Sequence, residues 1–504
     1  MFEVNNLSII VDNKYLVHNL SFHLNKNDKL AIIGEEGNGK TTLLKVLAGR
    51  CDYATVTGTI QSHQTRISYL PQNMPEDVLE ETGYQYLFHT DDDYYHKVNQ
   101  LYRYLRELKI KDSLLEETIK NMSGGEKIKI GLLKILLEEA DILLLDEPTN
   151  DLDLDALNWL EDFICYTDRP IIYVSHDETL LEKTANRILH LEQVKRKQEC
   201  RHTLLKTDYR TYVEQRLQEL QKQTQQAHFE KREYEKKRQK LLQVMQKVEY
   251  QQNTISRSDP HGARLLKKKM HALKAQEQKI EKQEITEVPS VEEQISFHFE
   301  EVNLPRTKAI LQLSLPILKV ANHVLARNLE LTVRGPEHIC IIGKNGAGKT
   351  TLLHVILEEL KKRKDLKVGY MPQNYEEVIQ EEESVIDFAS PSSSKEDRTK
   401  TRMYLGNVNI TTAEMEGKMK DLSNGSKAKV FLIHLVLLQC DVLLLDEPTR
   451  NVSPLSNPMI RKVLKEYKGA IISVSHDRKY IDEVTTKQYL LQEDGLIEMD
   501  KRSD

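Results

Sequence analysis

The stretch LLLDEPTNDLD, residues 143–153, returns in altered form as LLLDEPTRNVS at residues 443–453. Each copy is an apolar run that ends in an Asp-Glu pair, which is typical of a buried parallel strand with carboxylates at its carboxyl end. A segment of this length that is repeated 300 residues later indicates that one whole domain has been duplicated.

Four further motifs accompany each copy in the same order. The first series contains GEEGNGKTT (34–42), PQ (71–72), MSGGE (122–126) and VSHD (174–177). The second series contains GKNGAGKTT (343–351), PQ (372–373), LSNGS (422–426) and VSHD (474–477). Equivalent residues lie 300, 301 or 309 positions apart, so both series belong to copies of the same fold.

Each Gly-rich segment lies in the context that a P-loop requires. An apolar run (LAIIG at 30–34, ICIIG at 339–343) enters it, and a stretch with apolar residues at helical spacing follows. The sequence therefore predicts an α/β protein with two P-loop cassettes, over residues 1–200 and 296–504.

The segment between the cassettes, residues 201–295, has a period of 3.5 residues, which is typical of a coiled coil. Turn residues in NTISRSDPHG (253–262) predict the tip of a helical hairpin there. The second helix has a seam at Leu266, Met270, Leu273 and Ile280. The seam of the first helix has eleven positions, eight of them apolar or aromatic: Val213, Leu217, Leu220, Thr224, Ala227, Lys231, Tyr234, Arg238, Leu241, Met245 and Val248.

The hairpin is basic, although the whole chain has a formal charge of −6. Residues 209–287 hold 18 Lys or Arg against 11 Asp or Glu. A basic arm on an acidic body favours a nucleic-acid partner. We expect a cytoplasmic protein, because no apolar run is long enough for a membrane, the start MFEVNNLSII has no secretory pattern, and five cysteines are widely spaced.

The motifs predict a site for ATP and Mg²⁺ in each cassette. Glycines let backbone N–H groups surround the phosphates, a lysine neutralises them, and a hydroxyl binds the metal. The expected catalytic residues are Glu147 and Glu447, which would orient or deprotonate the attacking water, with His176 and His476, which would contact the γ-phosphate. The expected metal ligands are Thr41, Gln72, Asp146, Thr350, Gln373 and Asp446. The expected nucleotide contacts are Gly34, Gly37, Gly39, Lys40, Thr41, Thr42, Gln72, Ser123, Gly124, Gly125, Glu126, Gly343, Gly346, Gly348, Lys349, Thr350, Thr351, Gln373, Ser423, Asn424 and Gly425.

The SGGE segment, lying between a P-loop and an Asp-Glu strand, makes the chain resemble a tandem ABC ATPase. The resemblance implies that the signature of each cassette caps the nucleotide held by the P-loop of the other. With no membrane segment and a charged hairpin between the cassettes, the chain is similar to the ABC-F family of ribosome-associated translation factors. This implies a monomer that pairs its own cassettes and binds the ribosome through 23S rRNA and P-site tRNA. The expected contacts are Arg257, His261, Arg264, Lys267, Lys268 and Lys269.

The two copies differ where this resemblance predicts that they face each other. Asn424 and Ser426 stand where signature one has Gly124 and Glu126, and RNVS replaces NDLD at 450–453. Head-to-tail pairing puts these changes opposite Lys40, so we expect this site to turn over slowly and the site at Lys349 to hydrolyse. No aromatic residue precedes either P-loop at the place expected for adenine stacking; Tyr15 is displaced, and base selectivity is expected to be loose.

The subgroup is predicted from two missing features. Only 50 residues separate Gln72 from Met122, too few for the helical arm of general elongation factors, and no extended tail follows the final strand. The outline resembles the antibiotic-resistance ABC-F proteins of the Vga/Lsa type. This implies protection of the peptidyl-transferase centre by a hairpin inserted from the E site, with lincosamides, pleuromutilins or streptogramin A as the expected drugs.

Two alternatives remain at this point. One is a housekeeping ABC-F factor that relieves stalled ribosomes. The other is the ATPase subunit of a transporter, which leaves the basic hairpin unexplained. An SMC-like DNA machine is excluded, because its coiled coil interrupts a single cassette, whereas both cassettes here are continuous. The sequence does not identify the drug or the way in which the drug site is changed.

Overall fold

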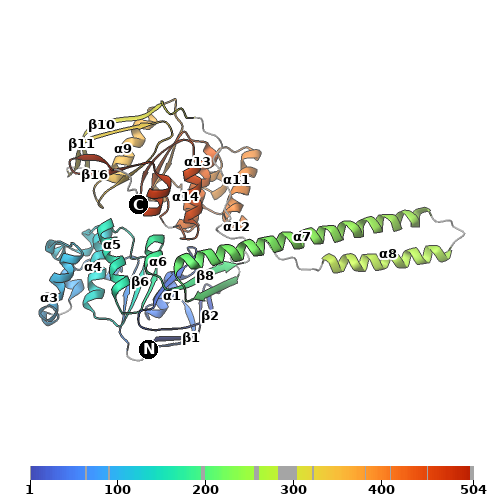
Figure 1. The fold of residues 1–504 in the computed structure, drawn as a ribbon, viewed down its shortest axis with the longest axis horizontal. Coiled ribbons are helices and arrows are strands. Elements are labelled where there is room, and N and C mark those ends of the chain that lie inside the picture. Colours follow the sequence, from blue (N-terminus) through green and yellow to red (C-terminus); the bar gives the residue numbers. More distant parts are fainter. Residues whose placement is uncertain are drawn as a thin grey trace. The chain divides into compact units, whose positions relative to one another are not determined.

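The computed structural model describes residues 2–62, 65–88, 91–194, 199–254, 260–281, 304–320, 323–380, 382–408, 410–450 and 452–499. The chain divides into two compact units, Met1–Tyr212 with Glu292–Asp504, and Val213–Val291. The first unit holds both predicted cassettes and the second holds the predicted hairpin (Figure 1). The fold prediction, two α/β P-loop cassettes joined by a helical hairpin, is confirmed.

The first cassette is built on a six-stranded sheet in the order β5-β6-β7-β3-β8-β9. All neighbours are parallel except the last pair, β8 and β9. The strands are β3 (Lys29–Ile33), β5 (Ile67–Leu70), β6 (Ile142–Asp146), β7 (Ile171–Val174), β8 (Arg187–Val194) and β9 (Glu199–Leu205). A separate antiparallel sheet has β1 (Phe2–Val11) between β2 (Lys14–Leu24) and β4 (Thr55–Gln61). The helices are α1 (Lys40–Leu47), α2 (Gly83–Leu87), α3 (Asp91–Glu107), α4 (Gly124–Leu137), α5 (Leu154–Tyr166) and α6 (Glu178–Thr184).

The second cassette repeats this sheet in the order β13-β14-β15-β12-β16-β17. Its strands are β12 (His338–Ile342), β13 (Val368–Met371), β14 (Val442–Asp446), β15 (Ala470–Val474), β16 (Lys487–Gln492) and β17 (Gly495–Met499), with the hairpin β10 (Ala309–Val320) and β11 (His323–Arg334) beside it. Its helices are α9 (Lys349–Lys361), α10 (Val385–Ala389), α11 (Lys395–Asn407), α12 (Thr412–Glu416), α13 (Asn424–Leu438), α14 (Asn457–Glu466) and α15 (Arg478–Val484).

The parallel order explains why motifs far apart in sequence meet. Every residue of β6 and of β14 is buried, as a strand covered on both faces requires. In each sheet the strand before the P-loop lies next to the strand that ends at the Ser-His motif, which in turn lies next to the Asp-Glu strand. Parallel strands share one carboxyl edge, so all three motifs are delivered there.

The first cassette extends beyond residue 200, the boundary expected from the sequence. Strand β9 pairs with β8 from Glu199 to Leu205, and the aromatic rings of Tyr209 and Tyr212 are buried against the cassette. The Tyr212 hydroxyl lies 2.7 Å from Nδ1 of His190, on β8. The helix of the hairpin therefore begins inside the first unit, because its first turn completes the packing of the sheet edge.

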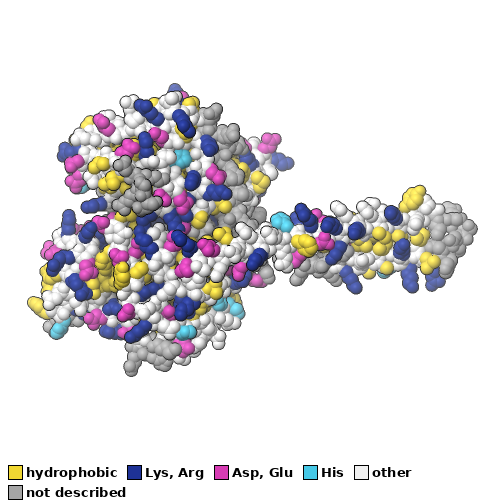
Figure 2. All heavy atoms as spheres, in the orientation of Figure 1, with side chains coloured by type: hydrophobic (Ala, Val, Ile, Leu, Met, Phe, Trp, Pro, Cys, Tyr) yellow, Lys and Arg dark blue, Asp and Glu magenta, His cyan; other side chains and the backbone are white. Residues whose placement is uncertain are grey.

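The hairpin consists of α7 (Tyr209–Thr254) and α8 (Pro260–Glu281). Four residues of the predicted seam, Leu220, Ala227, Leu241 and Val248, are buried, whereas Leu217 is exposed, as are the interrupting Lys231 and Arg238. Figure 2 shows dark blue Lys and Arg side chains along the hairpin with yellow hydrophobic side chains between them. Among the predicted ribosome contacts, Arg264, Lys267, Lys268 and Lys269 are exposed. Arg257 lies outside the described residues, as does the side chain of His261.

Candidate functional site

Each P-loop connects a buried strand to a helix through a left-handed glycine. Gly39 caps α1 with φ of 87° and Gly348 caps α9 with φ of 94°, a conformation that favours glycine. A Cβ atom would lie 2.9 Å from Leu16 at the first position and 2.8 Å from Leu325 at the second. Sequence reasoning missed these two leucines, which are equivalent residues and pack where an aromatic residue was sought. Tyr15 instead stacks edge-on against His18.

The P-loop lysines are held inside the loops that carry them. Lys40 Nζ donates to the carbonyl oxygens of Gly34 (2.8 Å) and Glu35 (3.0 Å), and Lys349 Nζ donates to those of Gly343 (2.9 Å) and Lys344 (3.0 Å). Burial lowers the pKa of both lysines, and the carboxylates at the ends of β6 and β14 oppose this effect. Each ammonium is thus placed at the carboxyl edge of its sheet, in the position for a bound phosphate.

The carboxylates expected to hold Mg²⁺ have different partners in the two cassettes. Asp146 accepts hydrogen bonds from the hydroxyls of Thr41 (3.1 Å) and Tyr69 (3.2 Å). Neither carboxylate oxygen of Asp446 meets a hydrogen-bond partner among the described residues, although both are buried and the Thr350 hydroxyl is nearby. Burial raises the pKa of both aspartates.

These residues fit a Mg²⁺ ion. The described part of the chain has no cluster of three His, Cys, Asp or Glu side chains. A hydroxyl, an amide oxygen and one carboxylate are nevertheless the hard oxygen donors that Mg²⁺ takes together with phosphate oxygens. Thr350, Gln373 and Asp446 line one cavity, and the two unpartnered oxygens of Asp446 are the observation that favours a cation there.

Glu147 and His176 form a tight pair at the end of β6. Glu147 has a left-handed backbone with φ of 50°, a strained conformation that is common at active sites. Its Oε2 accepts from the backbone N–H of His176 (3.1 Å), and Oε1 lies 3.1 Å from His176 Nε2. Burial raises the pKa of Glu147 to about 8 and lowers that of His176 to about 3. Burial therefore favours the uncharged form of both side chains.

The second pair is looser. Glu447 has φ of 52°, and its Oε2 accepts from the backbone N–H of His476 (3.2 Å). The distance between Glu447 Oε1 and His476 Nε2 is 3.8 Å. Burial raises the pKa of Glu447 to about 7 and lowers that of His476 to about 4. Both glutamates thus have a pKa raised by burial and both histidines a pKa lowered by it.

The signature motifs begin α4 and α13. Ser123 and Glu126 form a capping box, in which the Glu126 carboxylate accepts from the Ser123 backbone N–H (2.9 Å). Ser423 caps α13 alone, and its hydroxyl donates to that of Ser426 (3.1 Å). Replacement of Glu126 by Ser426 therefore removes half of the capping box, while the serine cap itself is retained.

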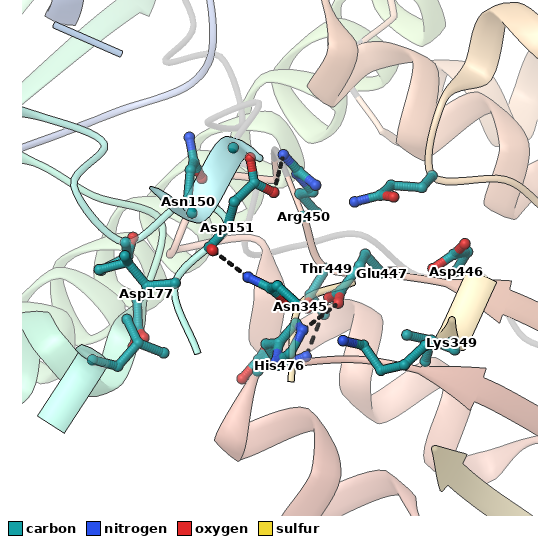
Figure 3. A pocket seen from close by; sticks show the side chains of 18 of the residues that line it. Asn150, Asp151, Asp177, Asn345, Lys349, Asp446, Glu447, Thr449, Arg450 and His476 are labelled. Carbon is teal, nitrogen blue, oxygen red and sulfur yellow. Dashed lines mark hydrogen bonds and ion pairs between the residues drawn. The ribbon is translucent and has the colours of Figure 1, made fainter. Parts of the chain in front are cut away.

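Residues of the second P-loop and of the first signature line one cavity of about 360 Å³, and Figure 3 shows Asn345 of that P-loop next to Asp151 of the other cassette. The Asn345 amide donates to the Asp151 backbone oxygen, and the Asp151 carboxylate lies 3.1 Å from Arg450 of the other cassette. The cavity contains most residues predicted for this site: Ser123, Gly124, Gly125, Gly346, Lys349, Thr350, Gln373, Asp446, Glu447 and His476. Gly343 and Thr351 belong to the adjoining P-loop and first turn of α9, and the Glu126 side chain is used in the capping box.

The first P-loop meets the second signature in the same head-to-tail manner, but through acidic side chains. Glu36 accepts from the Gly425 backbone N–H (2.7 Å), and Glu35 accepts from Lys429 Nζ (2.7 Å). His176 Nδ1 lies 2.8 Å from the Val452 backbone oxygen, so the neutral imidazole donates its proton there. Gln72 and Asn424 lie elsewhere, in a second cavity of about 420 Å³ between the two glutamine loops. Gly34, Gly37, Thr41 and Thr42 belong to the P-loop and the first turn of α1.

Buried ion pairs hold the cassettes together, and sequence reasoning missed them. Arg461 on α14 makes a bidentate pair with Glu178 on α6 (2.5 and 3.1 Å), with both side chains less than a tenth exposed. Arg478 pairs with Glu161 and with Asp177 (3.5 Å). The signal was present in the sequence, because the residue after VSHD is Glu178 in one copy and Arg478 in the other.

Comparison with known proteins agrees with this architecture. A family model described as ABC transporter matches residues 17–150 and 326–450. Ribosome protection protein VmlR of Bacillus subtilis is 28% identical, over 97% of this chain and 86% of that protein. ATP-binding protein Uup of Buchnera aphidicola is 27% identical (99% and 81%), and ABC transporter F family member 2 of Arabidopsis thaliana is 25% identical (98% and 76%). A solved structure of archaeal ribosome recycling factor aABCE1 with stalk protein aP1 matches with a TM-score of 0.61 at 17% identity, covering 96% of this chain and 88% of that one.

The family model covers more than half of the chain, and the chain belongs to the ABC family of ATPases. Two such domains lie in tandem, and the chain is similar over nearly its whole length to ABC transporter F family member 2. It is an ATP-binding enzyme that hydrolyses ATP. Among the helices that the structure describes, none is both long and apolar enough to cross a membrane.

Proposed function

We propose that this protein binds the ribosome in the presence of ATP and protects the peptidyl-transferase centre from antibiotics. Its interdomain hairpin would enter from the E site and displace or reshape P-site tRNA near the drug. Lincosamides, pleuromutilins and streptogramin A are the expected drugs. The observation that carries the proposal is the similarity to a ribosome protection protein over 97% of this chain, a span that includes the hairpin.

Within this proposal, the cassettes close on ATP and reopen after hydrolysis. Lys349 neutralises the terminal phosphates, Glu447 accepts a proton from the attacking water, and His476 contacts the γ-phosphate. A Mg²⁺ ion held by Thr350, Gln373 and Asp446 would neutralise charge on the phosphates. The equivalent residues around Lys40 bind nucleotide and support closure, with slower turnover. ATP binding therefore sets the closed form, and cleavage at the second P-loop releases it.

The hairpin supplies the contact with RNA. Arg264, Lys267, Lys268 and Lys269 are exposed, and with Arg257 and His261 they are the proposed contacts to 23S rRNA and tRNA. Lys/Arg contacts to phosphates release counterions, so ribosome affinity should fall steeply with salt. The protein would act as a monomer in the cytoplasm, associated with ribosomes.

Drug protection and ribosome binding can be tested together. Cells carrying the protein should resist one or more of the expected drugs, and cosedimentation with ribosomes should require ATP or a non-hydrolysable analogue. Replacing Lys267, Lys268 and Lys269 with Gln should flatten the salt dependence of cosedimentation. A Gly/Ser loop in place of residues 253–262 should retain ATPase and ribosome binding but lose protection. Binding that is insensitive to salt, or full protection by the loop variant, contradicts this proposal.

A housekeeping role is the second candidate. It is supported by similarity over nearly the whole chain to proteins whose names indicate no drug, among them ABC transporter F family member 2 and Uup. In that case deletion should slow growth or increase ribosome stalling without any drug, and none of the drug classes should distinguish the deletion strain from its parent.

A further inference from the structure

The two P-loops differ in charge at the two residues after their first glycine. Glu35 and Glu36 occupy these positions in the first loop, and Lys344 and Asn345 occupy them in the second. The backbones of the loops match, since Gly37 and Gly346 have φ of 80° and 76°. The difference therefore lies in the side chains that face the opposite cassette.

The carboxylate of Glu36 lies against the amino terminus of α13. It accepts from the Gly425 backbone N–H at 2.7 Å. The positive charges of Lys40 and Lys427 face the same carboxylate. Burial raises the pKa of this carboxyl group, and the Gly425 N–H, Lys40 and Lys427 oppose that effect because a helix amino terminus and ammonium groups favour an anion.

The second acidic residue strengthens this contact. Lys429 pairs with Glu35 across the cassettes (2.7 Å, side chains 9% and 24% exposed). Its equivalent in the first cassette, Lys129, instead pairs with Asp153 of its own cassette (3.1 Å). Ser453 replaces that aspartate in the second cassette, so Lys429 has no equivalent acid beside it and reaches the opposite P-loop. The two changes together join the first P-loop to the second signature.

At the Lys349 site, where the second P-loop faces the first signature, an amide side chain stands at the position equivalent to Glu36. Asn345 donates to the Asp151 backbone oxygen, which an ionised carboxylate cannot do. Ser123, Gly124 and Gly125 there line the cavity that also contains Lys349. The P-loop therefore contacts the opposite cassette through a carboxylate at the first site and through a neutral amide at the second.

We propose that Glu36 is a built-in competitor of the terminal phosphate at the Lys40 site. Its carboxylate takes the Gly425 N–H and the positive field that a phosphate would use, so nucleotide must displace it and binds there more weakly than at the Lys349 site. This inference rests on the proposed roles of the P-loops and signatures. It identifies the residue that makes the two sites unequal in affinity.

The test uses the full-length chain and a fluorescent N-methylanthraniloyl ATP with Mg²⁺. In a Lys349→Ala background, which isolates the Lys40 site, Glu36→Asn should tighten the dissociation constant about tenfold, which corresponds to about 1.4 kcal/mol. The reciprocal change, Asn345→Glu in a Lys40→Ala background, should weaken binding at the Lys349 site by a similar factor. Thermal unfolding of each variant checks that the cassettes remain folded.

The outcomes separate this inference from the proposed sites. Full binding by the Lys40→Ala, Lys349→Ala double variant would refute the P-loop assignment itself. If the double variant does not bind and Glu36→Asn binds no more tightly than its parent, Glu36 is not a competitor. The inference also fails if the Lys349→Ala protein does not bind the nucleotide, either with or without Glu36→Asn, while the Lys40→Ala protein does bind it. Tightening by Glu36→Asn together with weakening by Asn345→Glu supports it.

Discussion

The site at Lys40 and the site at Lys349 have matching backbones and different surroundings. Both use a strand, a glycine loop and a helix, and both have a glutamate with left-handed φ beside a neutral histidine. At Lys40 the opposing signature contacts acidic side chains of the P-loop, whereas at Lys349 an amide contacts a backbone oxygen. The P-loop glycines and lysine are therefore the same in both cassettes. The side chains with which each P-loop contacts the opposite cassette differ.

The same pattern extends over the surface between the cassettes. Glu178 and Arg478 are equivalent residues of opposite charge, and each forms an ion pair with the other cassette. A duplicated domain with identical surfaces would place like charges at such positions. Opposite charges favour one pairing of the two copies. The nucleotide sites show the same asymmetry, because their contacts to the opposite cassette also differ in charge. Four predictions, taken from the largest expected effect to the smallest, test whether these differences between the two cassettes affect stability, turnover and nucleotide binding.

Removal of Arg461 should have the largest effect. The Arg461→Ala variant leaves the buried Glu178 carboxylate with only Lys479 (3.3 Å), and since a buried charge left without any partner costs about 3–5 kcal/mol, the loss should approach the lower end of this range. Thermal unfolding should therefore show a clearly lower Tm. Arg402→Ala is the matched control, because Arg402 and Glu416 are about half exposed, and loss of such a pair costs about 1 kcal/mol or less. Equal decreases in Tm for the two variants would show that the buried pair at the interface stabilises the protein no more than an exposed pair does.

The two proposed catalytic glutamates, Glu147 and Glu447, should differ in their contribution to turnover. Glu447→Gln should lower steady-state ATPase about 100-fold or more, the range expected for loss of a general base. Glu147→Gln should lower it less than about tenfold, because its site is expected to turn over slowly. Nucleotide binding, measured in parallel, should remain in both variants. Comparable losses would mean that the two sites hydrolyse alike, despite their different surroundings.

The pH dependence of stability should reveal the buried Glu447 carboxyl. Its pKa is raised from 4.5 to about 7, so the folded protein keeps a proton that the unfolded chain releases. The resulting stability is fully present below pH 4.5 and is lost as pH rises through about 7. The side chain of the Glu447→Gln variant does not titrate, so the stability of this variant relative to wild type should grow by about 2–3 kcal/mol between pH 5 and 8. Absence of this growth in Glu447→Gln would exclude a raised pKa.

The smallest effect concerns the metal carboxylates. Tyr69→Phe removes a hydrogen bond from Asp146, which frees an oxygen and makes the first site more like the second. Affinity for Mg²⁺-ATP in a Lys349→Ala background should tighten by about 1 kcal/mol or less. The equivalent Tyr370 hydroxyl lies 2.8 Å from His354, so Tyr370→Phe should leave the second site unchanged. Weaker binding by Tyr69→Phe would show that the hydroxyl supports the site.

Much of the fold was predictable from the chain because it depends on short-range patterns. Apolar runs that end at Gly34, Asp146 and their copies predicted parallel strands, and the 3.5-residue period predicted the hairpin seam, including its interruptions at Lys231 and Arg238. The end of the first cassette was placed too early, because β9 has no apolar run of its own and is stabilised by pairing with β8. The arrangement of the signatures opposite the P-loops came from the family resemblance.

The sequence by itself determined that this protein has two phosphate-binding cassettes, because backbone conformation in a P-loop and periodicity in a helix are local properties. It also showed which residues differ between the copies. Only the tertiary structure decided what those differences do. Glu36 and Gly425 are 389 residues apart, and Glu35 and Lys429 are 394 apart. Such partners are chosen by which surfaces pack against each other, so the anionic contact at the first site is visible only when both cassettes are folded together.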